Sequence, residues 1–140
     1  MTITPSEIFS LALKRHRAPW NWTLHFAALF GFGLTLLLHS YLVFAVTMIV
    51  FGTGFFELGL PKAPDNRWFG FVTRGVEWEK NWVAAPWGWY KIRRFIYVLL
   101  IGLLTIWALW TRDAAVLALL IGFAFLIRIM RENMDVGIDP

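Results

Sequence analysis

Long runs of apolar residues with almost no charge constrain this chain more than any other feature. One apolar stretch covers positions 19–61, which is too long for a single membrane crossing, and polar residues at 39–41 interrupt it. A second stretch covers 92–130 and is interrupted in the same way at 111–113. Each half approaches the roughly 20 apolar residues that a helix needs to cross a bilayer.

We therefore predict an all-α, polytopic membrane protein with four transmembrane helices, arranged as two antiparallel hairpins. The predicted helices cover residues 20–38, 41–60, 92–110 and 113–130. Asp113 is suited to cap the last of them, and all six prolines fall outside the four cores. Because only 16% of the 140 residues are charged, against about 25% in soluble domains, we expect one membrane domain over 1–140.

The connector at 62–91 is predicted to be an amphipathic helix lying at the membrane surface. Aromatic residues recur in it at helical spacing, with Arg74, Glu77 and Lys80 on the other side. The connector either rests among lipid headgroups or serves as a docking surface for a partner or a lid over a lipid site. The residues predicted to contact lipid or a partner are Trp68, Phe71, Trp78, Trp82, Trp87 and Trp89.

The basic residues predict the orientation. Of the 13 Lys and Arg residues, only Arg112 lies on the side opposite to the N-terminus, the connector and the C-terminus. The positive-inside rule then places both termini in the cytoplasm, with a bacterial inner membrane as the expected location. The high isoelectric point of 9.9 suits anionic lipid, and nothing in the sequence indicates binding to nucleic acid.

Ionisable groups near the bilayer are the default candidates for function. His16 and His25 flank the start of the first predicted span, and Glu57 lies near the end of the second, so an antiparallel hairpin brings all three to one membrane face. Two imidazoles and a carboxylate suit a non-haem iron centre. The alternative is a hydrogen-bonded network, in which Asn21 and His25 anchor the first span and Glu57 pairs with a nearby Lys or Arg.

These residues resemble a known family. The segment from His16 to His25 has the H-x4-N-x3-H spacing, and residues 52–61 resemble the G-H-x3-E-x3-P segment, of the fungal 2-hydroxy fatty acid dioxygenases and their small bacterial relatives. The resemblance covers about residues 16–64 and implies an iron-dependent membrane enzyme that splits a 2-hydroxy acyl chain with oxygen. It makes His16 and His25 candidate ligands and Glu57 a ligand or supporting group, but Thr53 replaces the histidine that follows the glycine.

Two functions follow from this sequence. The first is a non-catalytic accessory or structural subunit of a larger integral-membrane complex, which needs no cofactor and contacts lipids and other membrane subunits. The second is an Fe(II)-dependent dioxygenase or hydroxylase of fatty acyl chains, with His16, His25 and Glu57 at the metal. A small-molecule or lipid-binding role is the third alternative, so the sequence leaves open whether the chain is an enzyme.

Overall fold

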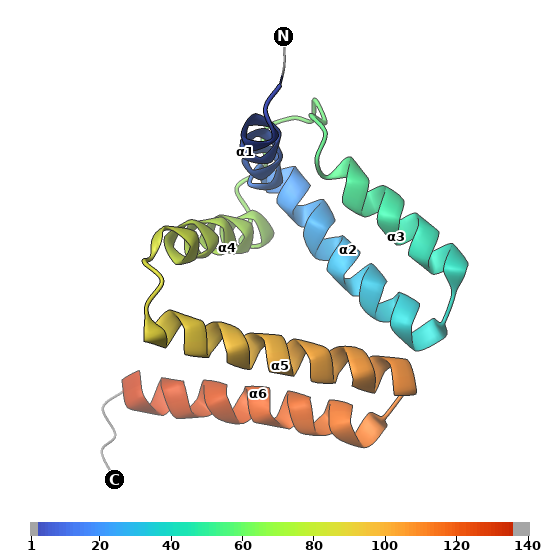
Figure 1. Ribbon diagram of the computed structural model, residues 1–140, viewed down its shortest axis with the longest axis vertical. Helices are drawn as coiled ribbons and strands as arrows, with labels where there is room; N and C mark the ends of the chain where they lie inside the picture. The colour runs from blue at the N-terminus through green and yellow to red at the C-terminus, as the bar shows by residue number, and fades with distance from the viewer. Residues whose placement is uncertain (1–2, 136–140) are drawn as a thin grey trace. The chain divides into compact units, whose positions relative to one another are not determined.

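The computed structural model describes residues 3–135, and within that range it consists of helices and connecting loops, without strands (Figure 1). The helices are α1 (Pro5–His16), α2 (Pro19–Leu38), α3 (Tyr41–Thr53), α4 (Arg67–Ala84), α5 (Trp89–Thr111) and α6 (Ala114–Asp135). Three of them, α2, α5 and α6, are long and apolar enough to cross a membrane. The prediction of an all-helical fold is therefore confirmed for the described residues, and three of the helices are suited to span a membrane.

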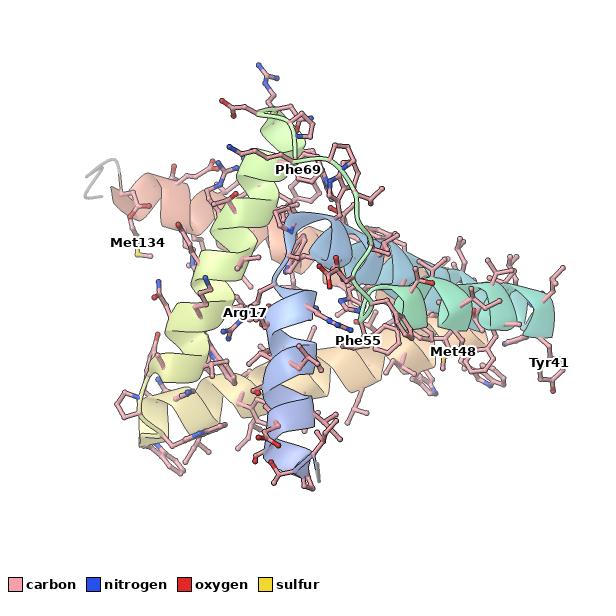
Figure 2. The ribbon with its side chains drawn as sticks, turned by 90° about the horizontal axis from the view of Figure 1, so that it is seen from above. Arg17, Tyr41, Met48, Phe55, Phe69 and Met134 are labelled. Atoms are coloured by element: carbon pink, nitrogen blue, oxygen red, sulfur yellow. The ribbon has the colours of Figure 1, made fainter. Side chains whose placement is uncertain are left out.

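The helix that was predicted over residues 41–60 is shorter than expected. α3 ends at Thr53, and its 13 residues measure about 20 Å at 1.5 Å per residue, against about 30 Å of bilayer core. Two features stop it: Gly52 and Gly54 favour helix poorly, and the carbonyls of Gly54 and Phe56 bond to a side chain on α2 instead of continuing the helix. Figure 2 shows α3 running from Tyr41 to the neighbourhood of Phe55. A fourth complete crossing stays a prediction.

Helix α1 was not anticipated by the hydropathy argument, because it is short and carries no long apolar run. It begins with a capping box: the Thr4 hydroxyl accepts from the backbone N–H of Glu7, and the Glu7 carboxylate accepts from the backbone N–H of Thr4. Pro5 occupies the first helical position, where its missing N–H costs nothing. The sequence Thr-Pro-Ser-Glu at positions 4–7 therefore carried the signal for this helix.

The chain divides into two compact units, the first ending at Lys91 and the second beginning at Ile92. In the first unit, α2 and α3 form the predicted antiparallel hairpin (Figure 1). His39 takes a left-handed conformation (φ 49°) between them, and the Ser40 side chain caps α3. Gly31 allows close packing, since a β-carbon there would collide with the side chain of Thr47.

Helix α4 occupies the middle of the predicted amphipathic connector and packs against the start of α2. Its buried face consists of Phe69, Val72 and Val76, with Trp20 and Trp22 of α2 against it. Helix α4 also approaches α2 closely at Gly75, where an added β-carbon would lie 2.8 Å from the Trp22 ring. Of the α4 residues that were expected to contact lipid or a partner, Trp68 packs against this core, whereas Phe71 and Trp78 are exposed.

The second unit contains most of α5 and all of α6, which are joined by a turn at Arg112 and Asp113. Asp113 is the predicted N-cap, because its Oδ1 accepts from the backbone N–H groups of Ala115 and Val116, each at 3.1 Å. Between residues 92 and 135, Ala108 is the one buried residue, while most of the large apolar side chains are exposed. Such helices need lipid or other protein around them.

Candidate functional site

Two of the candidate residues meet where α1 ends and α2 begins. His16 is the last residue of α1, and His25 lies less than two turns into α2. The chain turns between them at Arg17 and Ala18, so the two rings face each other with their Nδ1 atoms 2.5 Å apart and their centroids 4.7 Å apart. Of the three groups that the sequence predicts at one membrane face, His16 and His25 thus lie in contact.

The other nitrogen of each ring has its own partner. His16 Nε2 lies 3.1 Å from Oε2 of Glu79 on α4, and His25 Nε2 lies 3.1 Å from the carbonyl oxygen of Phe51 on α3. Arg17 also approaches Glu79, with 3.6 Å between Nε and Oε1. This chain of polar contacts ties together all four helices of the first unit.

The partners determine where the protons are when the two rings bond to each other. A carbonyl oxygen only accepts, so His25 Nε2 donates to Phe51 and His25 Nδ1 accepts in the neutral ring. A carboxylate oxygen also only accepts, so His16 Nε2 donates to Glu79, and the two Nδ1 atoms are left to bond to each other.

The surroundings of His25 are aromatic. The rings of Phe51 and Phe55 lie with their centroids 5.1 and 4.5 Å from the imidazole. Gly54 is required here, because a β-carbon at this position would lie 2.5 Å from His25 Nε2. The Gly-Thr-Gly segment at 52–54 therefore has a packing role beside the histidine pair.

Glu57 and Thr53 do not join the histidines. Glu57 lies exposed on the loop after α3, and Thr53 is exposed on the last turn of α3, where its hydroxyl donates to the carbonyl of Ile49 at 2.7 Å. Glu79 is the carboxylate at this site instead. Glu79 could not be predicted from the sequence, because the hairpin geometry favours Glu57 near the histidines and no local sequence signal shows how α4 docks on α2.

Asn21 has the anchoring role that the network alternative gave it. The residue is buried, and its side-chain NH₂ group donates to the carbonyls of Gly54 at 2.7 Å and Phe56 at 2.8 Å. One amide on α2 thus holds the beginning of the loop that leads from α3 to α4.

As a metal site, the cluster offers two imidazoles. Their anchored far nitrogens resemble the supporting contacts of metal-bound histidines. However, within residues 3–135 no group of three His, Asp or Glu side chains is arranged to hold a metal ion, since Glu79 lies on the far side of His16. The Nδ1 atoms would also have to separate to about 3 Å or more to share a metal through bonds of about 2.1 Å. This donor set does not fit the 2-His-1-carboxylate arrangement of non-haem iron enzymes.

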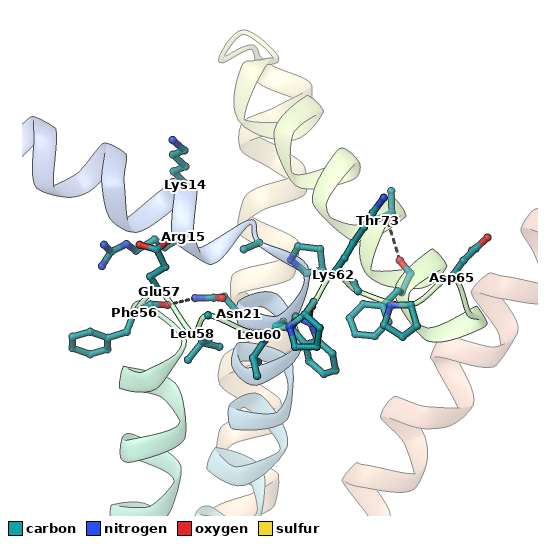
Figure 3. A pocket seen from close by; sticks show the side chains of 18 of the residues that line it. Lys14, Arg15, Asn21, Phe56, Glu57, Leu58, Leu60, Lys62, Asp65 and Thr73 are labelled. Atoms are coloured by element: carbon teal, nitrogen blue, oxygen red, sulfur yellow. Dashed lines mark hydrogen bonds between the residues drawn. The ribbon is translucent and has the colours of Figure 1, made fainter.

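A groove of about 810 Å³ lies on the other side of α1 (Figure 3). Its walls come from the last turns of α1, the first turn of α2, the loop at 56–65 and the start of α4. Glu57 is part of this groove, together with Lys14, Arg15 and Lys62. The network alternative pairs Glu57 with a nearby Lys or Arg; Glu57 lines the same groove as these cations, but none of the ion pairs found within residues 3–135 includes it.

The aromatic residues that were predicted to contact lipid or a partner differ in their surroundings. Trp68 and Phe71 pack within the first unit, and Trp68 Nε1 donates to the Thr23 hydroxyl at 3.0 Å. Trp82 and Trp87 enclose the ammonium group of Lys91, which lies 4.6 Å from each ring centroid. Trp78, Trp87 and Trp89 are more than half exposed and stay candidates for contact with lipid or protein.

The chain was compared with models of protein families, with curated proteins and with solved structures, and none of the three comparisons gives a match.

Proposed function

We propose that the chain is an accessory subunit of a larger integral-membrane assembly, and that α6 carries the main contact with its partner. The observation that carries this proposal is a shallow groove of about 390 Å³ along one face of α6. Ala115, Ala118 and Gly122 form its floor, with Leu119, Phe123 and Leu126 beside them. Small residues at such spacing let a second transmembrane helix approach closely.

The groove has room for another helix. A β-carbon added at Gly122 would meet no atom within 4 Å, so this position on α6 can take a side chain from a partner helix. In lipid, helices associate through close packing rather than through the hydrophobic effect, so a smooth small-residue face is a better partner surface than the bulky apolar faces around it.

The proposal includes the predicted orientation, with both termini in the cytoplasm. Antiparallel packing supports it, because α3 returns the chain to the level at which α2 begins: Asn21 bonds to Gly54 and Phe56. The first turn of α2 and the connector then lie on one membrane side, where the basic residues gather. A bacterial inner membrane is the location that we propose.

The experiment is co-purification with a matched pair of variants. Gly122→Leu fills the α6 groove, while Gly102→Leu adds the same side chain on α5, where no neighbour lies within 4 Å either. The proposal expects other membrane polypeptides to copurify with the wild type and with Gly102→Leu but to be lost from Gly122→Leu. Equal retention by both variants would refute α6 as the contact.

The second candidate is the Fe(II)-dependent oxygenase of fatty acyl chains that the family resemblance implies. The convergence of His16 and His25, each with its far nitrogen held by an acceptor, is the observation in its favour. Because the described residues supply two imidazoles and no third ligand at that point, further ligands would have to come from a substrate or another chain.

Iron content separates this candidate from the first. His25→Ala removes one imidazole of the pair, and His39→Asn is the control, since Asn tolerates the left-handed conformation at that turn. The oxygenase candidate expects stoichiometric iron in the wild type and in His39→Asn, and its loss from His25→Ala. Equal iron in His25→Ala and the wild type would eliminate it.

A further inference from the structure

The groove beside α1 combines two kinds of wall that rarely meet on a soluble protein. One part is apolar and is formed by Trp20, Phe56, Leu58, Leu60 and Phe69. The other part is cationic and is formed by Lys14 and Arg15 at the end of α1 and Lys62 on the loop. Its volume of about 810 Å³ lies in the range of pockets that enclose small molecules.

The two kinds of wall point in opposite directions. In Figure 3, the side chains of Leu58 and Leu60 project toward the side on which α2 and α3 extend away from the groove. The side chains of Lys14 and Lys62 project the other way, so their ammonium groups lie on the far side of the loop from the leucines. A molecule that uses both walls therefore has an apolar end toward the helices and an anionic end toward the lysines.

The position of the groove along α2 suits a molecule with an apolar end and an anionic end. Its wall includes Pro19, Trp20 and Asn21, the first turn of α2, and α2 is one of the helices suited to cross the bilayer. The apolar end of a bound molecule would thus continue along the spanning part of α2, while the cations lie at headgroup level. This geometry matches a phospholipid in the same leaflet.

The loop that forms the groove is held in place before any ligand binds. Asn21 bonds to the carbonyls of Gly54 and Phe56, and Trp20 Nε1 donates to the carbonyl of Pro61 at 3.0 Å. The fixed φ angles of Pro61 and Pro64 further limit the conformations of the loop. A preformed groove avoids the entropy cost of ordering the loop on binding.

We propose that this groove binds one anionic phospholipid, with its headgroup toward Lys14 and Lys62 and the start of an acyl chain along Leu58 and Leu60. The Arg15 guanidinium, which donates to the Phe55 carbonyl at 3.3 Å, adds to the positive charge of the groove. The three cations outnumber the two carboxylates of the groove, Glu57 and Asp65, so an anionic headgroup is favoured over a zwitterionic one. Free phosphate would leave the apolar wall bare. This site is independent of the partner contact on α6.

Lipid retention by the full-length protein tests the proposal. The protein, delipidated in mild detergent, receives phosphatidylglycerol and phosphatidylcholine with identical acyl chains, and native mass spectrometry measures how much of each stays bound. We expect phosphatidylglycerol to be retained at least about tenfold more, because each Lys or Arg near an anionic headgroup contributes measurably to binding. Equal retention of the two lipids would overturn the proposal.

A matched pair of triple variants separates the groove from general charge attraction. Lys14→Gln/Arg15→Gln/Lys62→Gln removes the three groove cations, whereas Arg67→Gln/Arg74→Gln/Arg131→Gln removes three exposed cations that do not line it. We expect the first variant to lose about tenfold in phosphatidylglycerol retention and the second to lose less than about twofold. The same loss in both would overturn the groove as the site.

Two further measurements use the wild-type protein, so they do not depend on how the variants fold. The second of them also distinguishes a lipid site from a site for free phosphate. Phosphatidylglycerol with a photoreactive group near the start of its acyl chain should label residues 56–62 of the wild-type chain, and labelling confined to other segments would overturn the proposal. Inorganic phosphate, supplied at the concentration of the lipid, should leave the bound lipid in place. Complete displacement would identify a phosphate site instead.

Discussion

Asn21 gives the sharpest test of how the first unit is built. Its side chain is buried and donates two hydrogen bonds, to the carbonyls of Gly54 at 2.7 Å and Phe56 at 2.8 Å. These bonds join the start of α2 to the end of α3 and to the loop that walls the groove. We predict that Asn21→Ala frees this loop while the helices stay folded.

The magnitude follows from the two bonds. Each neutral hydrogen bond contributes about 0.5–1.5 kcal/mol net, so losing both costs about 2 kcal/mol. A difference of 1.4 kcal/mol is a factor of ten, so local opening should become roughly 30-fold more frequent. The observable is hydrogen exchange at the amides of Phe55 and Phe56, which bond to the carbonyls of Gly52 and Thr53.

Asn81→Ala is the matched control, because Asn81 is exposed on α4 and far along the chain from this loop. We expect it to leave exchange at Phe55 and Phe56 unchanged, while Asn21→Ala accelerates it roughly 30-fold and leaves the amides in the middle of α2 protected. Exchange within about twofold of wild type in Asn21→Ala would refute the anchoring role.

Three further predictions concern α4, the turn before α5, and α1. Gly75→Ala places a β-carbon 2.8 Å from the Trp22 ring and should lower the free energy of unfolding by about 1–3 kcal/mol, whereas Gly70→Ala, whose β-carbon lies 3.9 Å from the end of Arg74, should raise it by up to about 1 kcal/mol. Thermal unfolding in detergent measures both changes, and the opposite order of stability would contradict the α2–α4 packing. The Lys91 ammonium lies between Trp82 and Trp87 and donates to the Ala85 carbonyl at 2.6 Å, so Lys91→Met, which removes the ammonium, should lower the free energy of unfolding by about 2 kcal/mol and change the tryptophan fluorescence. An unchanged thermal unfolding curve would refute the cation–π contact. Hydrogen bonds from the Thr4 backbone N–H and hydroxyl lower the pKa of Glu7, so the carboxylate stabilises α1 fully above the ordinary carboxyl pKa and loses this effect as pH falls through the lowered pKa. After correction for intrinsic exchange, amide exchange at Ile8 should therefore speed up on acidification in the wild type but not in Glu7→Gln.

Hydropathy and helical periodicity predicted the elements that depend on local sequence. The α2–α3 hairpin, the α5–α6 turn with its Asp113 cap, and a helix within the amphipathic connector are all found. Each rests on a strong local signal: an apolar run, an N-cap residue, or aromatic side chains at helical spacing.

The errors come from tertiary contacts that local signals do not record. Helix α3 ends at Thr53 because Asn21, more than 30 positions away, captures the carbonyls beyond it. The carboxylate beside His16 is Glu79 and not Glu57, because the docking of α4 is set by side-chain packing of Phe69, Val72 and Val76 on α2. The signal for the N-terminal helix α1 is its capping box, which a search for apolar runs does not detect.

The proposal that this chain is a subunit of a membrane assembly is tested most directly by the native mass and composition of the particle extracted from its own membranes in a mild detergent. We predict other polypeptides in fixed stoichiometry and a protein mass well above the 16.2 kDa of one chain. A lone chain, or a particle containing copies of this chain and no other polypeptide, would contradict it.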